Sequence, residues 1–343
     1  MLSKFVRAGL VGLAIAAAQA PAQAAEVTLR LHQFLPPQAT IPRMAIKPWA
    51  EKIEKESEGR IEIRQFHAMQ LGGTPGTLYD QAKDGVVDII WTVLGYTPGR
   101  FPKAEVFDLP FMVTTAEATS QAFHAFYEKH LTDEFKDVKV LAVHTHGPGL
   151  LHSKQPIEKL EDMRGVKIRG GSRVINDMLD KLGSTPVGMP VTGVSEALSK
   201  GVIDATTIPW EVTIAFKVPE LVENHTGFAG GHGLYTATFV FAMNQASYDK
   251  LPDDLKKVID DNSGIELAAA FGRAMDAGDE VGIEFARKLG NNIITLDDAE
   301  TKRWQDAAQP VIDDWTKAAD AAGIEGTVLY RDAVELVRKY GAQ

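Results

Sequence analysis

One arginine at the end of an expected strand has the type and position to bind an anion. In the segment Lys167–Ser172, Arg169 ends the strand, and Gly170 and Gly171 form a short turn before the next helix. A guanidinium group holds a carboxylate through two parallel hydrogen bonds, so it sets the direction of a ligand as well as its charge. The two glycines would let a ligand approach the backbone closely. Position alone leaves a second interpretation open, in which Arg169 is a surface or ion-pair residue.

Other chemistry-bearing patterns are weak or missing. His144 and His146 lie two residues apart in an expected strand and share a face, where they would either chelate a metal ion or line a strand end. The sequence has no phosphate-binding loop, no His-Glu-x-x-His motif, no Gly-x-Ser-x-Gly elbow and no Gly-x-Gly-x-x-Gly fingerprint. Because it has no cysteine, it has no disulfide, thiolate metal site or cysteine nucleophile. These observations disfavour the common hydrolase and transferase chemistries.

The charge of the chain argues against a further class of function. The 343 residues include 36 Lys and Arg against 46 Asp and Glu, which gives a net charge of −10. A protein that binds nucleic acid needs a basic surface to displace counterions from phosphates. We therefore expect no nucleic-acid partner.

The first residues are typical of an export signal. Lys4 and Arg7 precede an apolar stretch at 8–18, and Ala22-Gln23-Ala24 follows it. This order predicts a secretory signal peptide at 1–24 that is cleaved near Ala24. The apolar stretch is too short to span a membrane, and no later stretch is long and free of charge. We expect a protein of the periplasm of a Gram-negative cell, without direct membrane insertion.

Strands and helices alternate along the mature chain, which predicts an α/β fold. Expected strands at 27–31, 61–63 and 86–91 are separated by expected helices at 42–57 and 78–84. Strand, helix and strand repeated in this way indicate parallel pairing.

A second unit of the same kind follows, with expected strands at 140–143 and 166–169 and a helix at 172–182. Asp84–Asp88 and Lys200–Asp204 both have glycine, two β-branched residues and aspartate where a helix passes into a strand. This likeness suggests two similar lobes with a cleft at the strand ends, where ligands bind in open α/β sheets. The stretch from Pro252 to Leu289 predicts one long helix or two nearly continuous ones.

The segment Leu160–Arg169 resembles the core motif of the substrate-binding proteins of TRAP (tripartite ATP-independent periplasmic) transporters, the DctP-type family. Other segments resemble the same family in the same order along the chain: Gln70–Gly73, Asp84–Asp88, Phe107–Phe111, Gly201–Ala205 followed by Pro209, and Met243-Asn244 before Leu251–Leu255. The match covers essentially all of the mature chain, and its specificity comes from the ordered set of motifs.

The resemblance implies a two-lobed α/β binding protein with mixed sheets, hinge strands and a long helix that spans both lobes. Lobe I would comprise residues 25–146 and about 236–275, and lobe II residues 147–235 and about 276–343. It further implies a monomeric, non-enzymatic protein without a cofactor, which closes around an organic acid and delivers it to the membrane subunits of a TRAP permease.

The resemblance also implies the site. In the family, the arginine that matches Arg169 holds the ligand carboxylate. The other substrate-binding residues that we expect are Gln33, Phe34, Trp91, Thr92, Tyr96, His146, Ser172, Val191, Thr207, Ile208 and Trp210.

Departures from the family pattern narrow the ligand. Ile208 stands where many members have an asparagine that assists the carboxylate, and Gly149 stands where sialic-acid-type members have a second arginine. We therefore expect a monocarboxylate with an apolar or aromatic body, or a small hydroxy or oxo acid. Keto-acid-binding relatives use a tryptophan and a glutamate to bind a metal ion. We expect no metal here, and Trp210 and Glu211 are the candidates if one is bound.

Two other functions stay open at this point. One is an exported enzyme that acts on small carboxylic acids, with His144, His146 or Glu211 as acid or base. The other is a ligand-sensing subunit that docks onto a receptor.

Overall fold

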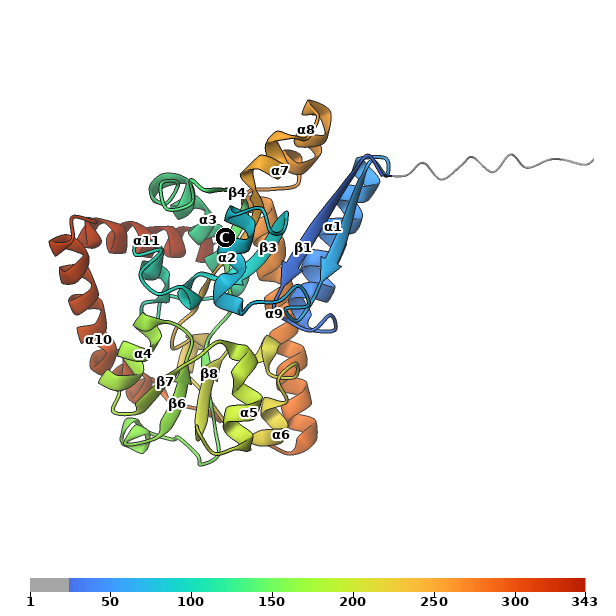
Figure 1. The fold of residues 1–343 in the computed structure, drawn as a ribbon. Helices are drawn as coiled ribbons and strands as arrows, with labels where there is room; N and C mark the ends of the chain where they lie inside the picture. The colour runs from blue at the N-terminus through green and yellow to red at the C-terminus, as the bar shows by residue number, and fades with distance from the viewer. Residues whose placement is uncertain (1–24, 343) are drawn as a thin grey trace, which may run out of the picture.

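Two mixed β-sheets divide the chain into two halves (Figure 1). The computed structural model describes residues 25–342, so the expected signal peptide lies outside the described residues. The first sheet has the order β2-β1-β3-β10-β4 and consists of β1 (Val27–Gln33), β2 (Ile61–Phe66), β3 (Ile89–Val93), β4 (Val138–Thr145) and β10 (Thr238–Asn244). The second has the order β11-β9-β5-β8-β6-β7 and consists of β5 (Leu150–Ser153), β6 (Lys167–Gly170), β7 (Thr185–Gly188), β8 (Ala205–Ile208), β9 (Asn224–Gly227) and β11 (Asn292–Thr295).

The two sheets repeat one arrangement over four strands. In β2-β1-β3-β10 and in β7-β6-β8-β5, the first three strands are parallel and the fourth is antiparallel. The likeness between Asp84–Asp88 and Lys200–Asp204 has the same origin, because each segment carries the chain from a helix into the third strand of its set. Gly85 (φ 72°) and Gly201 (φ 69°) end those helices in the left-handed conformation. The expected two-lobed α/β fold is confirmed.

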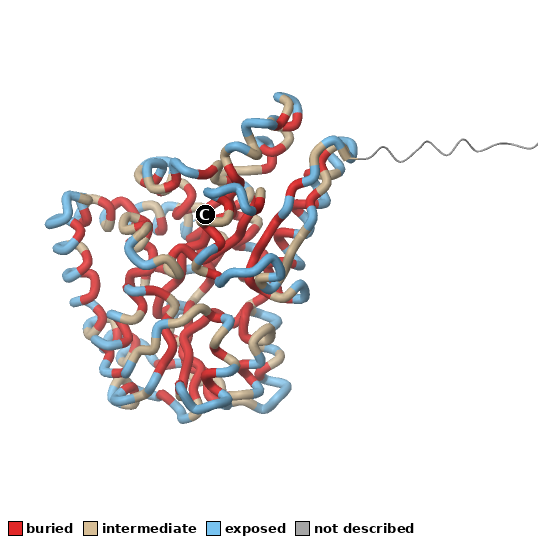
Figure 2. Tube along the Cα trace, viewed as in Figure 1, coloured by how far each residue is buried: buried red, intermediate tan, exposed pale blue. Residues whose placement is uncertain are grey.

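Helices pack against each sheet and leave most strand residues buried (Figures 1 and 2). On the first half they are α1 (Lys47–Glu56), α2 (Leu78–Lys83), α3 (Ala116–His130), α7 (Gln245–Asp249) and α8 (Asp253–Asp261). On the second half they are α4 (Arg173–Lys181), α5 (Val194–Ser199) and α6 (Val218–Leu221). A π-helical turn at Pro42–Ile46 precedes α1 and places Pro48 in the first turn of that helix, where a proline is tolerated.

Two connecting segments and one long helix join the halves. Residues 146–149 lead from β4 to β5, and residues 228–237 lead from β9 back to β10. The two segments pair with each other, since Gly149 N–H donates to the Tyr235 carbonyl (2.9 Å) and Leu234 N–H donates to the Gly149 carbonyl (2.9 Å). They form a double-stranded hinge between the sheets.

The long helix α9 (Ile265–Leu289) spans both halves. It is separate from α8 because Gly264 takes a positive φ of 88° between them. A Cβ atom at Gly272 would clash with the backbone of Glu117 on α3, and one at Gly282 would clash with the Trp210 carbonyl beyond β8. The glycines that weaken the helix in isolation therefore let it pack closely against each half in turn.

The C-terminal helices correct one expected boundary. The helix α10 (Asp298–Ala321) runs along the second half, but α11 (Gly326–Gly341) returns to the first half and packs against α3. The Asp332 carboxylate accepts from Lys129 Nζ (2.6 Å) and lies 3.0 Å from His130 Nε2, and both of these residues belong to α3. Residues 326–341 thus belong with the first sheet and not with lobe II, because their buried face has its partner there.

The ion pair of α11 makes stability depend on pH in a defined direction. The Lys129 ammonium beside Asp332 lowers the pKa of that carboxyl to about 2. A carboxyl whose pKa is lower in the folded state stabilises the fold fully above its unfolded pKa of about 4, and this contribution is lost as the pH falls to about 2. We expect Asp332→Asn to lower the free energy of unfolding at pH 7 by roughly 1–2 kcal/mol.

Urea unfolding of both proteins at several pH values checks this expectation. The difference in the free energy of unfolding between the wild type and Asp332→Asn should become smaller as the pH falls from 4 to 2. Glu335→Gln, at an exposed position on the same helix, is the control and should follow the wild-type curve. A difference that stays constant down to pH 2 would mean that the ion pair does not carry the effect.

Candidate functional site

A pocket lies between the two halves, and both contribute to its walls. From the first half, the lining residues are Phe34, Leu35, Trp91, Val93, Tyr96 and Phe239. From the second half they are Arg169, Gly171, Ile175, Val191, Ile208, Pro209, Glu211 and Val212. The hinge segments add His146, Tyr235 and Ala237. The pocket thus lies where the carboxyl ends of β1, β3, β6 and β8 face each other, as the α/β reasoning predicts.

Arg169 lies in this pocket as a buried cation without a protein anion. Its side chain is held by main-chain carbonyls: Nε–H donates to Met189 O (2.8 Å) and Nη1–H to Thr207 O (3.1 Å). Only 3% of the residue is exposed, and no carboxylate among residues 25–342 lies within ion-pair distance of it. A buried charge without a counterion is costly, so this geometry favours the binding of an anion. It does not support a surface or ion-pair role for Arg169.

The glycines beside Arg169 have a different use from the one expected. A Cβ atom at Gly171 would lie 3.0 Å from Arg169 Nη2, and one at Gly170 would clash with Asn176. Both positions therefore make room for side chains of the protein itself. Gly171 also lines the pocket, next to the guanidinium group.

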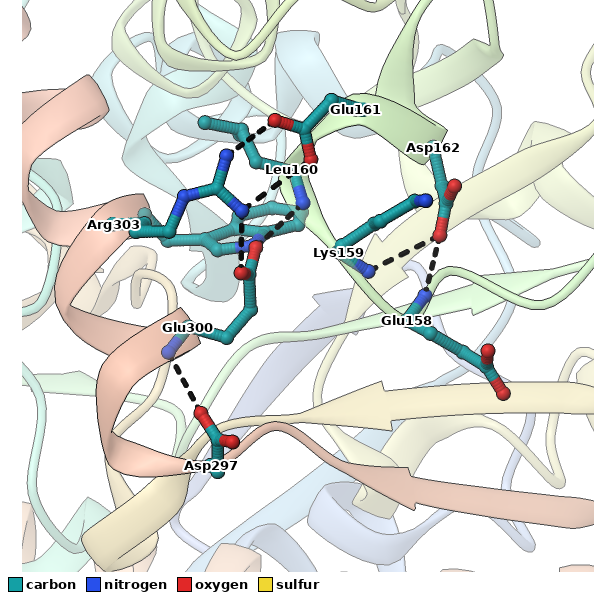
Figure 3. A network of polar contacts seen from close by, with 9 residues as sticks. Glu158, Lys159, Leu160, Glu161, Asp162, Asp297, Glu300 and Arg303 are labelled. Carbon is teal, nitrogen blue, oxygen red and sulfur yellow. Dashed lines mark hydrogen bonds and ion pairs between the residues drawn. The ribbon is translucent and has the colours of Figure 1, made fainter.

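The residues that precede Arg169 attach its strand to α10 (Figure 3). Asp162 accepts hydrogen bonds from the N–H groups of Glu158 (2.9 Å) and Lys159 (3.1 Å), which closes the turn before β6. Leu160 N–H donates to Glu300 Oε1 (2.7 Å) on α10, and Arg303 of that helix pairs with Glu161. The motif that resembles the family thus has a structural role, since it fixes the position of the strand that carries Arg169.

Stacked aromatic rings form the wall of the first half. Phe34 stacks on Trp91 (ring centroids 4.9 Å apart, planes at 12°), and Trp91 stacks on Phe239 (5.1 Å, 11°). Tyr96 meets Phe34 edge-on at 5.7 Å. Such a wall offers flat apolar faces and ring edges, which suit an aromatic or apolar ligand.

The two histidines of β4 and the hinge are neutral and fully hydrogen-bonded. His144 Nε2 accepts from Trp91 Nε1–H (2.8 Å), and His146 Nε2 accepts from Ala237 N–H (3.0 Å). Each Nδ1–H then donates to a carbonyl, that of Thr145 (3.3 Å) or Gly147 (2.6 Å). Burial lowers the pKa of His144 to about 3 and that of His146 to about 4. Neither imidazole has a free nitrogen with which to act as an acid, a base or a metal ligand.

Glu211 is the second ionisable residue of the pocket wall. Burial raises the pKa of its carboxyl to about 8, so that the group is mostly protonated at neutral pH. Trp210, its partner in the expected metal pair, does not line the pocket and packs against His152 (5.0 Å) and His225 (4.7 Å). Within the described residues, no group of three His, Asp or Glu side chains is placed to hold a metal ion.

Four further predicted residues lie outside the pocket lining because the backbone uses their side chains. Thr92 Oγ1–H donates to Pro75 O (3.0 Å), and Gln33 Nε2–H donates to Leu35 O (2.8 Å). Ser172 caps α4 by accepting from Ile175 N–H (3.3 Å), and Thr207 Oγ1–H donates to Arg169 O (3.2 Å). Among these residues, Thr207 still acts on the site, because its carbonyl holds the Arg169 guanidinium.

Sequence reasoning missed the alternating residues Tyr235, Ala237 and Phe239. All three line the pocket, and their period of two is the signal of an extended segment that could have revealed them. Tyr235 lies near the charge of Arg169, and burial raises its pKa to about 12, so its hydroxyl group stays protonated. The Tyr235 ring also fills the space next to Gly149, where any Cβ atom would clash with it. A second arginine at position 149 is therefore sterically incompatible with this arrangement.

Direct contacts across the pocket hold the halves together in a closed arrangement. Val191 N–H donates to Tyr96 Oη (3.0 Å), and Thr40 Oγ1–H donates to the Glu211 carbonyl (3.0 Å). At the rim, Arg173 pairs with Glu105 (Nε to Oε1, 3.3 Å). Each pair joins a residue of the first half to one of the second.

Comparison with known proteins identifies the family. The family model of bacterial extracellular solute-binding proteins, family 7 (DctP), matches residues 32–318. The chain belongs to this family. The expected resemblance to TRAP substrate-binding proteins is thereby confirmed, and solute binding in transport is its function class.

Solved structures of family members are closely similar. A TRAP solute-binding protein from Rhodoferax ferrireducens T118, in complex with copurified benzoate, is 47% identical with a TM-score of 0.90, over 92% of this chain and 98% of the other. A marine metagenome protein specific for aromatic acids, in complex with 3-hydroxybenzoate, is 46% identical with a TM-score of 0.91, over 92% and 99%. One from Bordetella bronchiseptica with bound mandelate is 30% identical with a TM-score of 0.83, over 91% and 99%. In the present chain, none of the helices within residues 25–342 has the length and apolar character needed to span a membrane.

The Tyr96 contact offers a test of closure. Tyr96→Phe keeps the ring but removes the hydroxyl oxygen that accepts from Val191 N–H. In this variant, closure of the halves would bury the Val191 N–H without a partner. Because an unmet hydrogen bond of this kind costs about 1–1.5 kcal/mol, we expect roughly five- to tenfold weaker ligand binding.

Isothermal titration calorimetry measures this effect, and the unfolding temperature of the ligand-free protein should change little. Tyr248→Phe is the matched control, since the Tyr248 hydroxyl bonds Asp260 at the far end of the first half. Equal affinity of Tyr96→Phe and the wild type would show that this contact does not contribute to closure.

Proposed function

We propose that this solute-binding protein captures an aromatic monocarboxylate in the periplasm and delivers it to a TRAP-type membrane permease. The observation that carries the proposal is the buried Arg169 guanidinium, which has carbonyl partners but no counterion. The stacked wall of Phe34, Trp91 and Phe239 supports an aromatic body for the ligand. The relatives that hold benzoate and 3-hydroxybenzoate support the same class.

The pocket is suited to one charge and one ring. Arg169 is its only buried cation among the lining residues. A second ionised carboxylate would therefore have no counterion there, and its burial would be costly. These facts favour a monocarboxylate over a dicarboxylate or a polar sugar acid.

Lobe closure would convert a weak contact into a strong one. In an open cleft, water competes for both ions, and an exposed ion pair contributes about 1 kcal/mol or less. Closure removes water and lowers the local dielectric, which strengthens the pair between Arg169 and the carboxylate. The permease would then recognise the closed form, because only this form presents the surfaces of both halves in a fixed register.

We infer that the protein is not an enzyme. His144 and His146 were the candidate acid or base groups, and both are neutral with both ring nitrogens bonded. Burial raises the pKa of Glu211 and of the neighbouring Asp279, which disfavours the ionised form that a general base needs. The hypothesis of a receptor subunit has no observation in its favour in the described residues.

Removal of the guanidinium group tests the proposal. We expect Arg169→Ala to abolish the thermal shift that benzoate gives the wild type, because truncation of one partner of a buried charge pair costs about 2–5 kcal/mol. This corresponds to roughly 30- to 5,000-fold weaker binding. Differential scanning fluorimetry and calorimetry against a panel of aromatic, aliphatic and sugar acids measure both quantities.

Arg164→Ala is the control for this variant, since Arg164 is exposed in the same motif, and it should keep the wild-type shift. A full benzoate shift in Arg169→Ala would refute the role of Arg169. A wild type that prefers sugar acids or dicarboxylates would refute the ligand class.

The aromatic wall gives a second test. Phe34→Leu removes one stacking face while it keeps an apolar side chain, so benzoate should bind about fivefold more weakly and cyclohexanecarboxylate should be nearly unaffected. The ratio of the two dissociation constants is the measurement. Phe123→Leu, in the core of the first half, should lower the unfolding temperature without changing the ratio. An unchanged ratio in Phe34→Leu would contradict a stacking role.

A further inference from the structure

Glu211 presents an unpartnered polar atom in a pocket that is otherwise almost entirely apolar. Its Oε2 atom is buried and has no hydrogen-bond partner among the described residues. We propose that Oε2 of Glu211 binds a hydroxyl group of the ligand, so that Glu211 makes the protein selective for a hydroxylated aromatic acid. This inference rests on the proposed function and specifies the ligand class of the same site.

The backbone of Glu211 is held on both sides, which fixes the position from which its side chain starts. Its N–H donates to Asp279 Oδ1 (2.7 Å) on α9, and its carbonyl accepts from Thr40 Oγ1 (3.0 Å). A Cβ atom at Gly278 would lie 2.8 Å from Glu211 Cβ, so α9 packs directly behind this residue. With α9 on one side, Glu211 contributes to the pocket lining on the other.

The surroundings of Glu211 determine which ligand group matches it. No cation among residues 25–342 forms an ion pair with Glu211, and burial raises the pKa of its carboxyl, which favours the neutral form. A neutral carboxyl group offers one O–H donor together with acceptor lone pairs. A hydroxyl group both donates and accepts, so it can satisfy either arrangement, whereas a methyl group at the same place would leave Oε2 unpaired.

The size of the expected preference for a hydroxyl group follows from the burial of Glu211 Oε2. A site with a buried polar group discriminates against a ligand that leaves the group unpaired, since the desolvation of that group is then not compensated. Arg169 on β6 and Glu211 in the turn after β8 line the same pocket, so a ligand bound there lies beside both residues. The position of the hydroxyl group on the ring is what the experiment determines.

The experiment compares ligands in which a hydroxyl group is replaced by a methyl group of similar size. Calorimetry gives dissociation constants of the wild type for benzoate, 3-hydroxybenzoate and 3-methylbenzoate, and for the 4-substituted pair. We expect one hydroxybenzoate to bind at least about tenfold more tightly than its methyl counterpart. In Glu211→Met the preference should fall below about threefold, through tighter binding of the methyl compound. Glu211→Gln keeps a donor and an acceptor and should retain most of the preference.

The outcomes separate this inference from the proposed function. If benzoate and the methylbenzoates bind in an Arg169-dependent manner without any preference for a hydroxyl group, the inference fails and the proposed function stands. If no aromatic acid binds the wild type, the proposed function itself fails. A preference that survives in Glu211→Met, or one that disappears with EDTA because a metal ion mediates it, would also overturn the inference. If Glu211→Met does not fold, Glu211→Leu takes its place, and a wild type without a hydroxyl preference overturns the inference by itself.

Discussion

The site depends on one buried positive charge that the protein holds in place but does not neutralise. Arg169 gives two N–H groups to the carbonyls of Met189 and Thr207, which orient the guanidinium without cancelling its charge. An internal carboxylate would have stabilised the arginine and blocked the site at the same time. The carbonyl groups fix the geometry of the guanidinium, and its positive charge stays available to pair with an anionic ligand. The orientation of β6, and its attachment to α10 through Leu160 and Glu161, serve this one side chain.

Two segments of the chain, the long helix α9 and contacts across the pocket connect the halves. The hinge consists of the connecting segments 146–149 and 228–237 together with the helix α9. Hydrogen bonds at Gly149, Leu234 and Tyr235 join the two segments. Glycines in α9 bring its backbone against α3 on one half and against the turn after β8 on the other. Tyr235 belongs both to this hinge and to the pocket wall. Closure and the shape of the pocket are therefore coupled through the same residues.

The rest of the pocket is arranged to have little polarity of its own. The stacked rings of Phe34, Trp91 and Phe239 form one wall. Burial keeps His144 and His146 neutral, and their ring nitrogens are all hydrogen-bonded. In such surroundings a single polar group has a large effect on selectivity, since water does not compensate for an unpaired atom. Arg169 and Glu211 are the two groups that remain, and they differ in charge and in the partners they require.

The sequence by itself determined the fold class and the family, and it singled out the arginine that lies buried in the pocket. These follow from local patterns: hydrophobic periodicity, ordered motifs and an arginine at a strand end. It also placed Phe34, Trp91, Tyr96, Val191 and Ile208, which the pocket contains. Only the tertiary structure decided which polar side chains are available. Thr92, Gln33, Ser172 and Thr207 have suitable types, but nearby backbone groups already use them. The unpaired Oε2 of Glu211, the hinge residue Tyr235 and the return of α11 to the first half likewise depend on contacts between distant segments, which no local pattern encodes.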